Sequence, residues 1–211
     1  MIRQGLLATV LLVSTTVFAG FVFAQSAPDH SRPIQPTGRQ HDVYAIYSML
    51  MPGTYFASMG PDRNQRWAIA DTTINATDIN PALEPEAALK APPEHPRRFH
   101  DAVVDYQQRR DNRQTITHNL QLDHPYTLLT QADIEEFRTV LATPNAGSQL
   151  QSKYSGYPGI NYFSDVYFNP QRNAALVYMM GWCGNLCAQS EWVYLEKQDG
   201  QWIRRSGQGG R

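Results

Sequence analysis

Residues 162–205 read YFSDVYFNPQRNAALVYMMGWCGNLCAQSEWVYLEKQDGQWIRR, and this stretch decides the fold. It contains apolar, aromatic and β-branched runs separated by turn-forming residues, which is typical of consecutive strands. The predicted strands are 162–169, 174–180, 191–197 and 201–206. Asp199-Gly200 is a strong signal for a two-residue hairpin turn. The stretch therefore predicts a C-terminal antiparallel meander.

Upstream of the meander, apolar residues recur with helical spacing in three places. Positions i, i+3, i+4 and i+7 form one face of a helix, and capping residues mark where a helix begins. The expected inner faces are Val43, Ile46, Tyr47 and Leu50; Phe99, Ala102, Val103 and Tyr106; and Ile134, Phe137 and Leu141. We expect Asp42 to cap the first helix and Thr130 with Asp133 to cap the third.

Two shorter segments alternate as strands do, and a third segment is rich in proline. Residues 66–73 and 115–122 are the predicted strands, while 80–96 holds five prolines and is expected to be a loop or a lid. Helices come mostly early and the meander comes late. This order predicts an α+β fold, with an antiparallel β-sheet and about three helices packed on one face.

The N-terminus has the three parts of a secretory signal peptide. Arg3 provides the positive charge, residues 5–23 are apolar and uncharged, and Ala24 precedes the expected cleavage site at Gln25. The apolar run approaches the length of a membrane span, but polar residues and glycine dilute it. We expect export to the periplasm or the medium, with no stable membrane insertion after cleavage.

The expected organisation has four parts. They are a signal peptide at 1–24, a proline-rich disordered leader at 25–41, a single α+β domain at 42–206 and a tail at 207–211. The formal net charge of the whole chain is −1. A nearly neutral chain has no electrostatic reason to bind nucleic acid, so we expect no nucleic-acid partner.

The chain has two cysteines, Cys183 and Cys187, with Gly184 and Asn185 between them. Glycine and asparagine accept positive φ, so a tight loop can bring the two cysteines within disulfide range. A structural disulfide is expected in an oxidising compartment. A thiol–disulfide catalyst is an alternative, although such catalysts typically carry C-x-x-C at a helix N-terminus. A metal site would need more ligands, so we expect neither a metal nor a cofactor.

A series of short motifs marks the last third of the chain. They are SDVYFN at 164–169, ALVY at 175–178, CGNLC at 183–187, LEK at 195–197 and GQW at 200–202. Together they resemble the C-terminal signature of a group of uncharacterised bacterial exported proteins, and the resemblance spans about residues 43–203. It implies export, but no activity, cofactor or ligand. The group often has glycines after its second cysteine, whereas Ala188 and Gln189 follow here.

An acid–base site is one functional hypothesis. Asp71 follows an apolar strand, a place where sites often form, and His100 or His118 would be its partner in a small hydrolase. However, the six histidines lack the spacing of helical metal ligands, and the glycine motifs of serine hydrolases and nucleotide-binding loops are missing. His118 lies on the apolar side of its predicted strand, which is more typical of a packed histidine.

Aromatic residues near turns favour a different hypothesis. Trp182, Asn185, Leu186 and Gln189 are the predicted binding surface, together with segment 80–96. We therefore expect a non-catalytic binding or interaction module for an envelope or extracellular protein, peptide or glycan. The alternatives are the small hydrolase and a purely structural envelope protein, in which the aromatic residues pack within the sheet.

Overall fold

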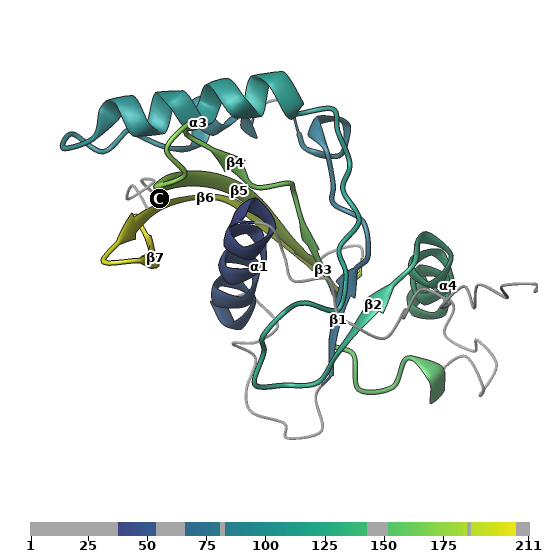
Figure 1. The fold of residues 1–211 in the computed structure, drawn as a ribbon. Helices are drawn as coiled ribbons and strands as arrows, with labels where there is room; N and C mark the ends of the chain where they lie inside the picture. The colour runs from purple at the N-terminus through teal and green to yellow at the C-terminus, as the bar shows by residue number, and fades with distance from the viewer. Residues whose placement is uncertain (1–37, 54–65, 81–82, 143–151, 185–186, 206–211) are drawn as a thin grey trace, which may run out of the picture. The chain divides into compact units, whose positions relative to one another are not determined.

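The computed structural model describes residues 38–53, 66–80, 83–142, 152–184 and 187–205 (Figure 1). The chain divides into two units, Met1–Gln35 and Pro36–Arg211, and all described residues belong to the second. The signal peptide, most of the leader and the tail that the sequence predicts lie outside them. No helix in the described part combines the length and apolar character that crossing a bilayer requires.

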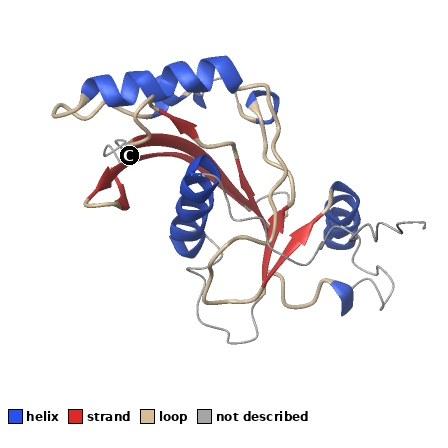
Figure 2. Ribbon diagram, viewed as in Figure 1, coloured by secondary structure: helices blue, strands red, loops and turns tan. Residues whose placement is uncertain are grey.

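A seven-stranded mixed sheet forms the centre of the described unit (Figure 2). Its strands are β1 (Trp67–Ala70), β2 (Tyr126–Leu129), β3 (Ile160–Phe163), β4 (Tyr167–Phe168), β5 (Ala174–Trp182), β6 (Ala188–Gln198) and β7 (Gln201–Arg204). The order is β2-β1-β3-β5-β6-β7, and β4 also pairs with β5. β1 runs parallel to β2 and β3, while the remaining pairs are antiparallel. The α+β class and the C-terminal meander are therefore confirmed.

Helices cover both faces of this sheet, whereas the sequence predicted one face. The helices are α1 (Gly38–Leu50), α2 (Pro85–Ala88), α3 (Pro96–Arg109) and α4 (Gln131–Ala142), with short 3-10 turns at Met51–Gly53 and Ala76–Asp78. α3 and α4 bury their apolar residues in one hydrophobic cluster, and α1 buries its own in a second cluster on the other side (Figure 1).

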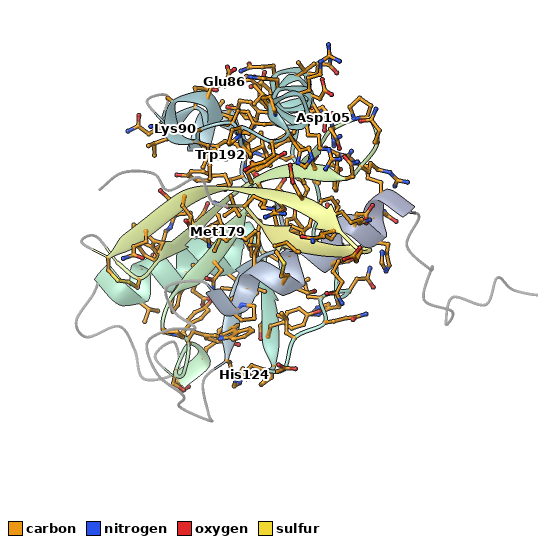
Figure 3. The ribbon with its side chains drawn as sticks, turned by 90° about the vertical axis from the view of Figure 1, so that its left-hand side faces the viewer. Glu86, Lys90, Asp105, His124, Met179 and Trp192 are labelled. Carbon is orange, nitrogen blue, oxygen red and sulfur yellow. A yellow bond between two sulfur atoms is a disulfide. The ribbon has the colours of Figure 1, made fainter. Side chains whose placement is uncertain are left out.

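The central strand β5 shows why two layers are needed. Leu176 and Tyr178 belong to the α3 side, while Val177 and Met179 belong to the α1 side. A strand that is apolar on both faces must be covered on both faces. In a sequence, a continuous apolar run indicates such a strand, whereas an alternating run indicates a strand covered on one face. Figure 3 shows the same division in β5 and β6, with Trp192 on the α3 side and Met179 on the other.

The predicted strand at 115–122 is wrong, and Tyr126–Leu129 is the strand instead. Only Thr115 forms a bridge, to Thr72. The backbone N–H groups of Thr117 and Gln121 donate to the side-chain oxygens of Tyr44 and Ser48 on α1. Ile116 and Leu120 are nevertheless buried. His118, which the sequence placed on the same side, is exposed, so the predicted alternation holds only for these two apolar residues. Side chains of α1 replace the ladder hydrogen bonds that a strand would make.

Of the predicted helix caps and turns, two are confirmed and one is wrong. At the start of α4, Thr130 Oγ1 accepts from Asp133 N–H, and Asp133 Oδ2 accepts from Thr130 N–H, so the predicted capping pair is confirmed. The predicted hairpin turn is also confirmed, because Asp199 and Gly200 both have positive φ. Asp42 does not begin α1, which starts at Gly38. Its buried carboxylate instead accepts a hydrogen bond from Lys197 Nζ at 2.6 Å.

The segment predicted as one strand at 162–169 is interrupted at residues 164–166. Ser164 pairs with β5 by its backbone and its side chain, since its N–H donates to Tyr178 O and its Oγ accepts from Tyr178 N–H. The interruption directs Asp165 toward Arg109 at the C-terminal end of α3. A regular strand would have continued the alternation through this position without bringing a carboxylate to that helix.

Candidate functional site

A disulfide joins Cys183 and Cys187, as the sequence predicted, with 5.1 Å between their Cα atoms. The flanking residues Trp182 and Ala188 are the last paired positions of β5 and β6. The bridge therefore closes the end of a hairpin that already has its full ladder, a stabilising role. Asn185 and Leu186, two residues of the predicted binding surface, lie outside the described residues.

Replacing both cysteines with serine is expected to lower the free energy of unfolding, because the disulfide restricts the unfolded chain. The loss should be only about 2 kcal/mol, since the loop that the bridge closes is very short. Denaturant titration of the oxidised wild type and the double variant measures this difference. Reductant should destabilise the wild type by the same amount and leave the variant unchanged. A loss of ligand binding at unchanged stability would contradict a purely structural role for the bridge.

Trp182 packs inward against α4, while Gln189 is exposed in β6. The Trp182 ring lies edge-on to Phe137 with 6.4 Å between ring centroids. The Arg138 guanidinium lies 5.2 Å from the centroid of the Trp182 ring. Trp182 is thus partly buried and supports a cation, an arrangement that depends on α4 and that the sequence did not predict.

The segment predicted as a loop or lid packs onto the sheet where the structure describes it. Residues 83–96 contain α2, and Ala88 and Leu89 pack against the α3-side cluster. Trp192 Nε1 donates to Leu83 O, and His95 Nδ1 lies 3.2 Å from Glu196 Oε2. These contacts hold the segment against β6, so it forms part of the fold in the described structure.

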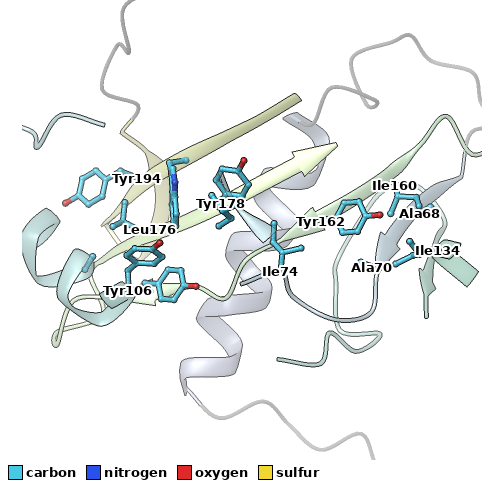
Figure 4. Packing of buried hydrophobic residues seen from close by; sticks show 14 of the residues in the cluster. Ala68, Ala70, Ile74, Tyr106, Ile134, Ile160, Tyr162, Leu176, Tyr178 and Tyr194 are labelled. Atoms are coloured by element: carbon cyan, nitrogen blue, oxygen red, sulfur yellow. The ribbon is translucent and has the colours of Figure 1, made fainter. Parts of the chain in front are cut away.

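A pocket of about 530 Å³ lies where the parallel strands β1 and β2 end. Three sheet residues, three residues of α4 and loop residues that follow β1 and α3 line it. The lining residues are Ala70, Asp71, Thr72, Ile74, Asp78, Arg113, Gln131, Ile134, Arg138, Tyr162 and Met180. Figure 4 shows Ala70, Ile134 and Tyr162 grouped together, away from Tyr106 and Tyr194 near α3. Carboxyl ends of parallel strands are a frequent place for ligands.

The four charged residues of this pocket fall into two kinds. Arg113 and Asp78 neutralise each other at 2.8 Å, and Arg113 also donates to Thr73 O. Asp71 and Arg138, by contrast, form no ion pair with any described residue. Asp71 Oδ1 accepts from the Thr72 hydroxyl at 2.9 Å, and Arg138 donates to the Tyr162 hydroxyl at 3.3 Å. The pocket therefore presents one carboxylate and one guanidinium that form no ion pair within the described part of the chain.

Tyr162 forms a buried aromatic wall of the pocket. Burial raises the pKa of its hydroxyl, while the positive charge of Arg138 acts in the opposite direction. The phenol therefore stays protonated at physiological pH and accepts the Arg138 hydrogen bond as a neutral group. It holds the guanidinium in place without cancelling its charge.

The two histidines predicted as partners of Asp71 lie elsewhere. His100 is exposed on α3, with its Nδ1 3.9 Å from Glu86 Oε1. His118 is exposed, and its ring lies tilted against Tyr126 with 5.5 Å between centroids, so it is not the packed core histidine that the sequence predicted. Neither lines the pocket that contains Asp71, and no hydrogen bond joins either one to Asp71 in the described structure. The described residues also contain no group of three or more potential metal ligands.

Comparison of the chain with protein-family models, with curated proteins and with solved structures found no match. Asp71 was detectable from the sequence, because it directly follows a buried strand. Arg138 was not, since an arginine on an exposed helix position carries no local signal that it faces a pocket. Its placement depends on Trp182 and Tyr162, which are distant in the sequence.

Proposed function

We propose that the protein is a non-catalytic binding module of the exported compartment, and that the pocket at the ends of β1 and β2 is its ligand site. The observation that carries this proposal is the pair of uncompensated charges, Asp71 and Arg138, over an apolar wall. Ligand sites are typically apolar cavities with a few polar groups that fix orientation. The candidate partners are an envelope or extracellular protein, a peptide or a glycan.

The chemistry of the pocket favours binding over turnover. Arg138 and Asp71 can orient a ligand through charge-assisted hydrogen bonds. Turnover by nucleophilic catalysis would require a nucleophile with a base in hydrogen-bond reach. Thr72 is the aliphatic hydroxyl of the lining, and it donates to Asp71. The hydrolase hypothesis would have to use this pair alone, without the histidine that the sequence suggested.

Export is the second part of the proposal. It is supported by the signal-like sequence at 1–24, by the Cys183–Cys187 disulfide, which suits an oxidising compartment, and by the resemblance to bacterial exported proteins. The mass of the protein recovered from the exported fraction without reductant tests this part. Cleavage after Ala24 with loss of two hydrogens is the expected result. An uncleaved, reduced chain would contradict export.

Binding is tested by incubating the disulfide-bonded protein with two mixtures, a protease digest of a bulk protein and an enzymatic digest of bacterial cell wall. Mass spectrometry of the digest components that stay bound to the protein should show that some of them are enriched. Their masses should be the same as in the starting digest. Trp182→Ala is expected to reduce that enrichment, and Trp182→Phe to retain most of it, because phenylalanine keeps an aromatic face under Arg138. No enrichment from either digest would contradict the proposal, and so would protein-dependent cleavage abolished by Asp71→Asn.

A further inference from the structure

We infer that the pocket at the ends of β1 and β2 binds a small zwitterion with an ammonium and a carboxylate group, either a free α-amino acid or a short peptide. The inference rests on the proposed binding function and specifies its ligand. It follows from three properties of the pocket, namely the sign of its uncompensated charges, the way these charges are held, and the size of its apolar part.

Of the four charged residues that line the pocket, only Arg113 and Asp78 form an ion pair with each other. Arg113 and Asp78 already neutralise each other, so neither needs a ligand as counter-ion. Asp71 and Arg138 line the same pocket and have no ion-pair partner among the described residues. An ammonium group would complement Asp71 and a carboxylate would complement Arg138. A ligand with only one of these charges would leave the other protein charge unmatched.

Arg138 is held in a way that suits a carboxylate. Its guanidinium lies over the Trp182 ring and uses one terminal nitrogen on the Tyr162 hydroxyl. A guanidinium has five N–H donors in a planar fork, so a bidentate contact to a carboxylate remains open. Because the aromatic face and the phenol already orient the side chain, less conformational freedom is lost when the ligand binds.

Asp71 is held by the backbone, because it directly follows β1. Its N–H donates to Leu129 O at 2.9 Å, which ties its backbone to the end of β2. One carboxylate oxygen accepts from Thr72, and a carboxylate can accept several further hydrogen bonds. An ammonium group provides three donors and no acceptor, which matches this open acceptor capacity. The two charged ends of a zwitterion therefore have separate sites, one directly after β1 and one on α4.

The remaining walls accept an apolar side chain. Ile74, Ile134, Tyr162 and Met180 contribute apolar surface to the pocket. The volume of about 530 Å³ lies within the range of roughly 300–1,000 Å³ that small-molecule sites have. It exceeds the needs of one amino acid and suits a short peptide as well. Leucine-containing ligands are thus suitable probes of both sources.

Isothermal titration calorimetry of the disulfide-bonded protein tests the inference with four probes. Leucine and leucyl-leucine are zwitterions of two lengths, N-acetyl-leucine carries only the carboxylate, and leucinamide carries only the ammonium. At least one zwitterion is expected to bind about tenfold or more tightly than both blocked probes, because each blocked probe leaves one protein charge unmatched. The ratio for leucine against leucyl-leucine distinguishes the amino acid from the peptide.

Two conservative variants test which protein residue binds the ammonium end of the ligand and which binds the carboxylate end. Asp71→Asn is expected to weaken leucinamide and the preferred zwitterion about tenfold, but to leave N-acetyl-leucine unchanged. Arg138→Gln is expected to weaken N-acetyl-leucine and the zwitterion, but to leave leucinamide unchanged. Asp101→Asn and Arg97→Gln, on α3, are matched controls that remove the same charges away from the pocket. They should bind all four probes as the wild type does.

Equal affinity for the zwitterions and the blocked probes would overturn the inference, and so would zwitterion binding that neither pocket variant weakens. Absence of binding by the folded wild type up to about 10 mM would also overturn it. These failures are distinguishable from failure of the proposed function. If the cell-wall digest yields enriched uncharged glycans while the zwitterions do not bind, the protein is a binding module for another ligand. If neither digest yields an enriched species, the proposed function fails as well.

Discussion

Replacing Arg109 with methionine is expected to lower the free energy of unfolding by about 3–5 kcal/mol at neutral pH, because it leaves the buried Asp165 and the half-buried Asp105 without their main counter-charge. Arg109 forms an ion pair with Asp165, whose side chain is only 4% exposed, and a second with Asp105 at 3.4 Å. The guanidinium of Arg39 lies farther away, at 3.7 Å from the Asp105 carboxylate and 3.9 Å from the Asp165 carboxylate. Chemical denaturation of the variant and the wild type measures the loss.

The loss is expected to depend on pH. Burial raises the pKa of Asp165 above its ordinary value of 3.8, and Arg109 acts against this rise. Burial also raises the pKa of Asp105. A raised carboxyl pKa means that the folded state binds protons more readily. The associated stability is complete below the unfolded pKa and is lost as the pH rises through the folded pKa.

Removing Arg109 raises the pKa of Asp165 further, so the variant should lose stability more steeply than the wild type above pH 3.8. Its deficit relative to the wild type should therefore be smaller at about pH 4 than at about pH 7. A double variant with Asp165→Asn should recover part of the loss. Arg113→Met removes an exposed ion pair and should cost less than about 1 kcal/mol. Equal deficits at both pH values, without recovery in the double variant, would contradict this account.

Phe163→Ala is expected to lower the free energy of unfolding by about 3–5 kcal/mol, as truncation of a fully buried phenylalanine usually does. Phe163 is completely buried on the α1 side of β3. Its ring stacks on Tyr47 of α1 with 4.7 Å between centroids. The Tyr47 hydroxyl donates to Ser164 O at 2.7 Å, so the cavity would lie directly at the α1–sheet contact. Thermal and denaturant unfolding measure the effect.

Val104→Ala on α3 is the matched control for this truncation. Val104 is 54% exposed, so its loss should change the free energy of unfolding by less than about 0.5 kcal/mol. The comparison tests the finding that both faces of the sheet are covered. If Phe163→Ala were as mild as Val104→Ala, the α1 side of β3 would be open to solvent, and the second hydrophobic layer would be absent.

The sequence was most informative where a pattern repeats within one element. Phe99, Ala102, Val103 and Tyr106 share one face of α3, and all four are buried as their spacing predicted. The meander was equally readable, because apolar runs and Asp199-Gly200 are local signals. The pattern at 115–122 misled, since Ile116 and Leu120 are buried without a strand ladder. Periodicity reports which side chains are buried, but not which groups satisfy the backbone.

By itself the sequence determined the class of fold, the C-terminal meander, the capping pair of α4 and the pairing of the two cysteines. The class of fold follows from the order of the elements along the chain. The other three depend on residues close together in the chain, whose spacing restricts the local geometry. Only the tertiary structure decided that α1 covers the opposite face from α3, and that Asp71 and Arg138 line one pocket. The reason is physical. An uncompensated charge and a shared cavity are defined by distances between separate elements, and those distances arise only when both faces of the sheet are packed.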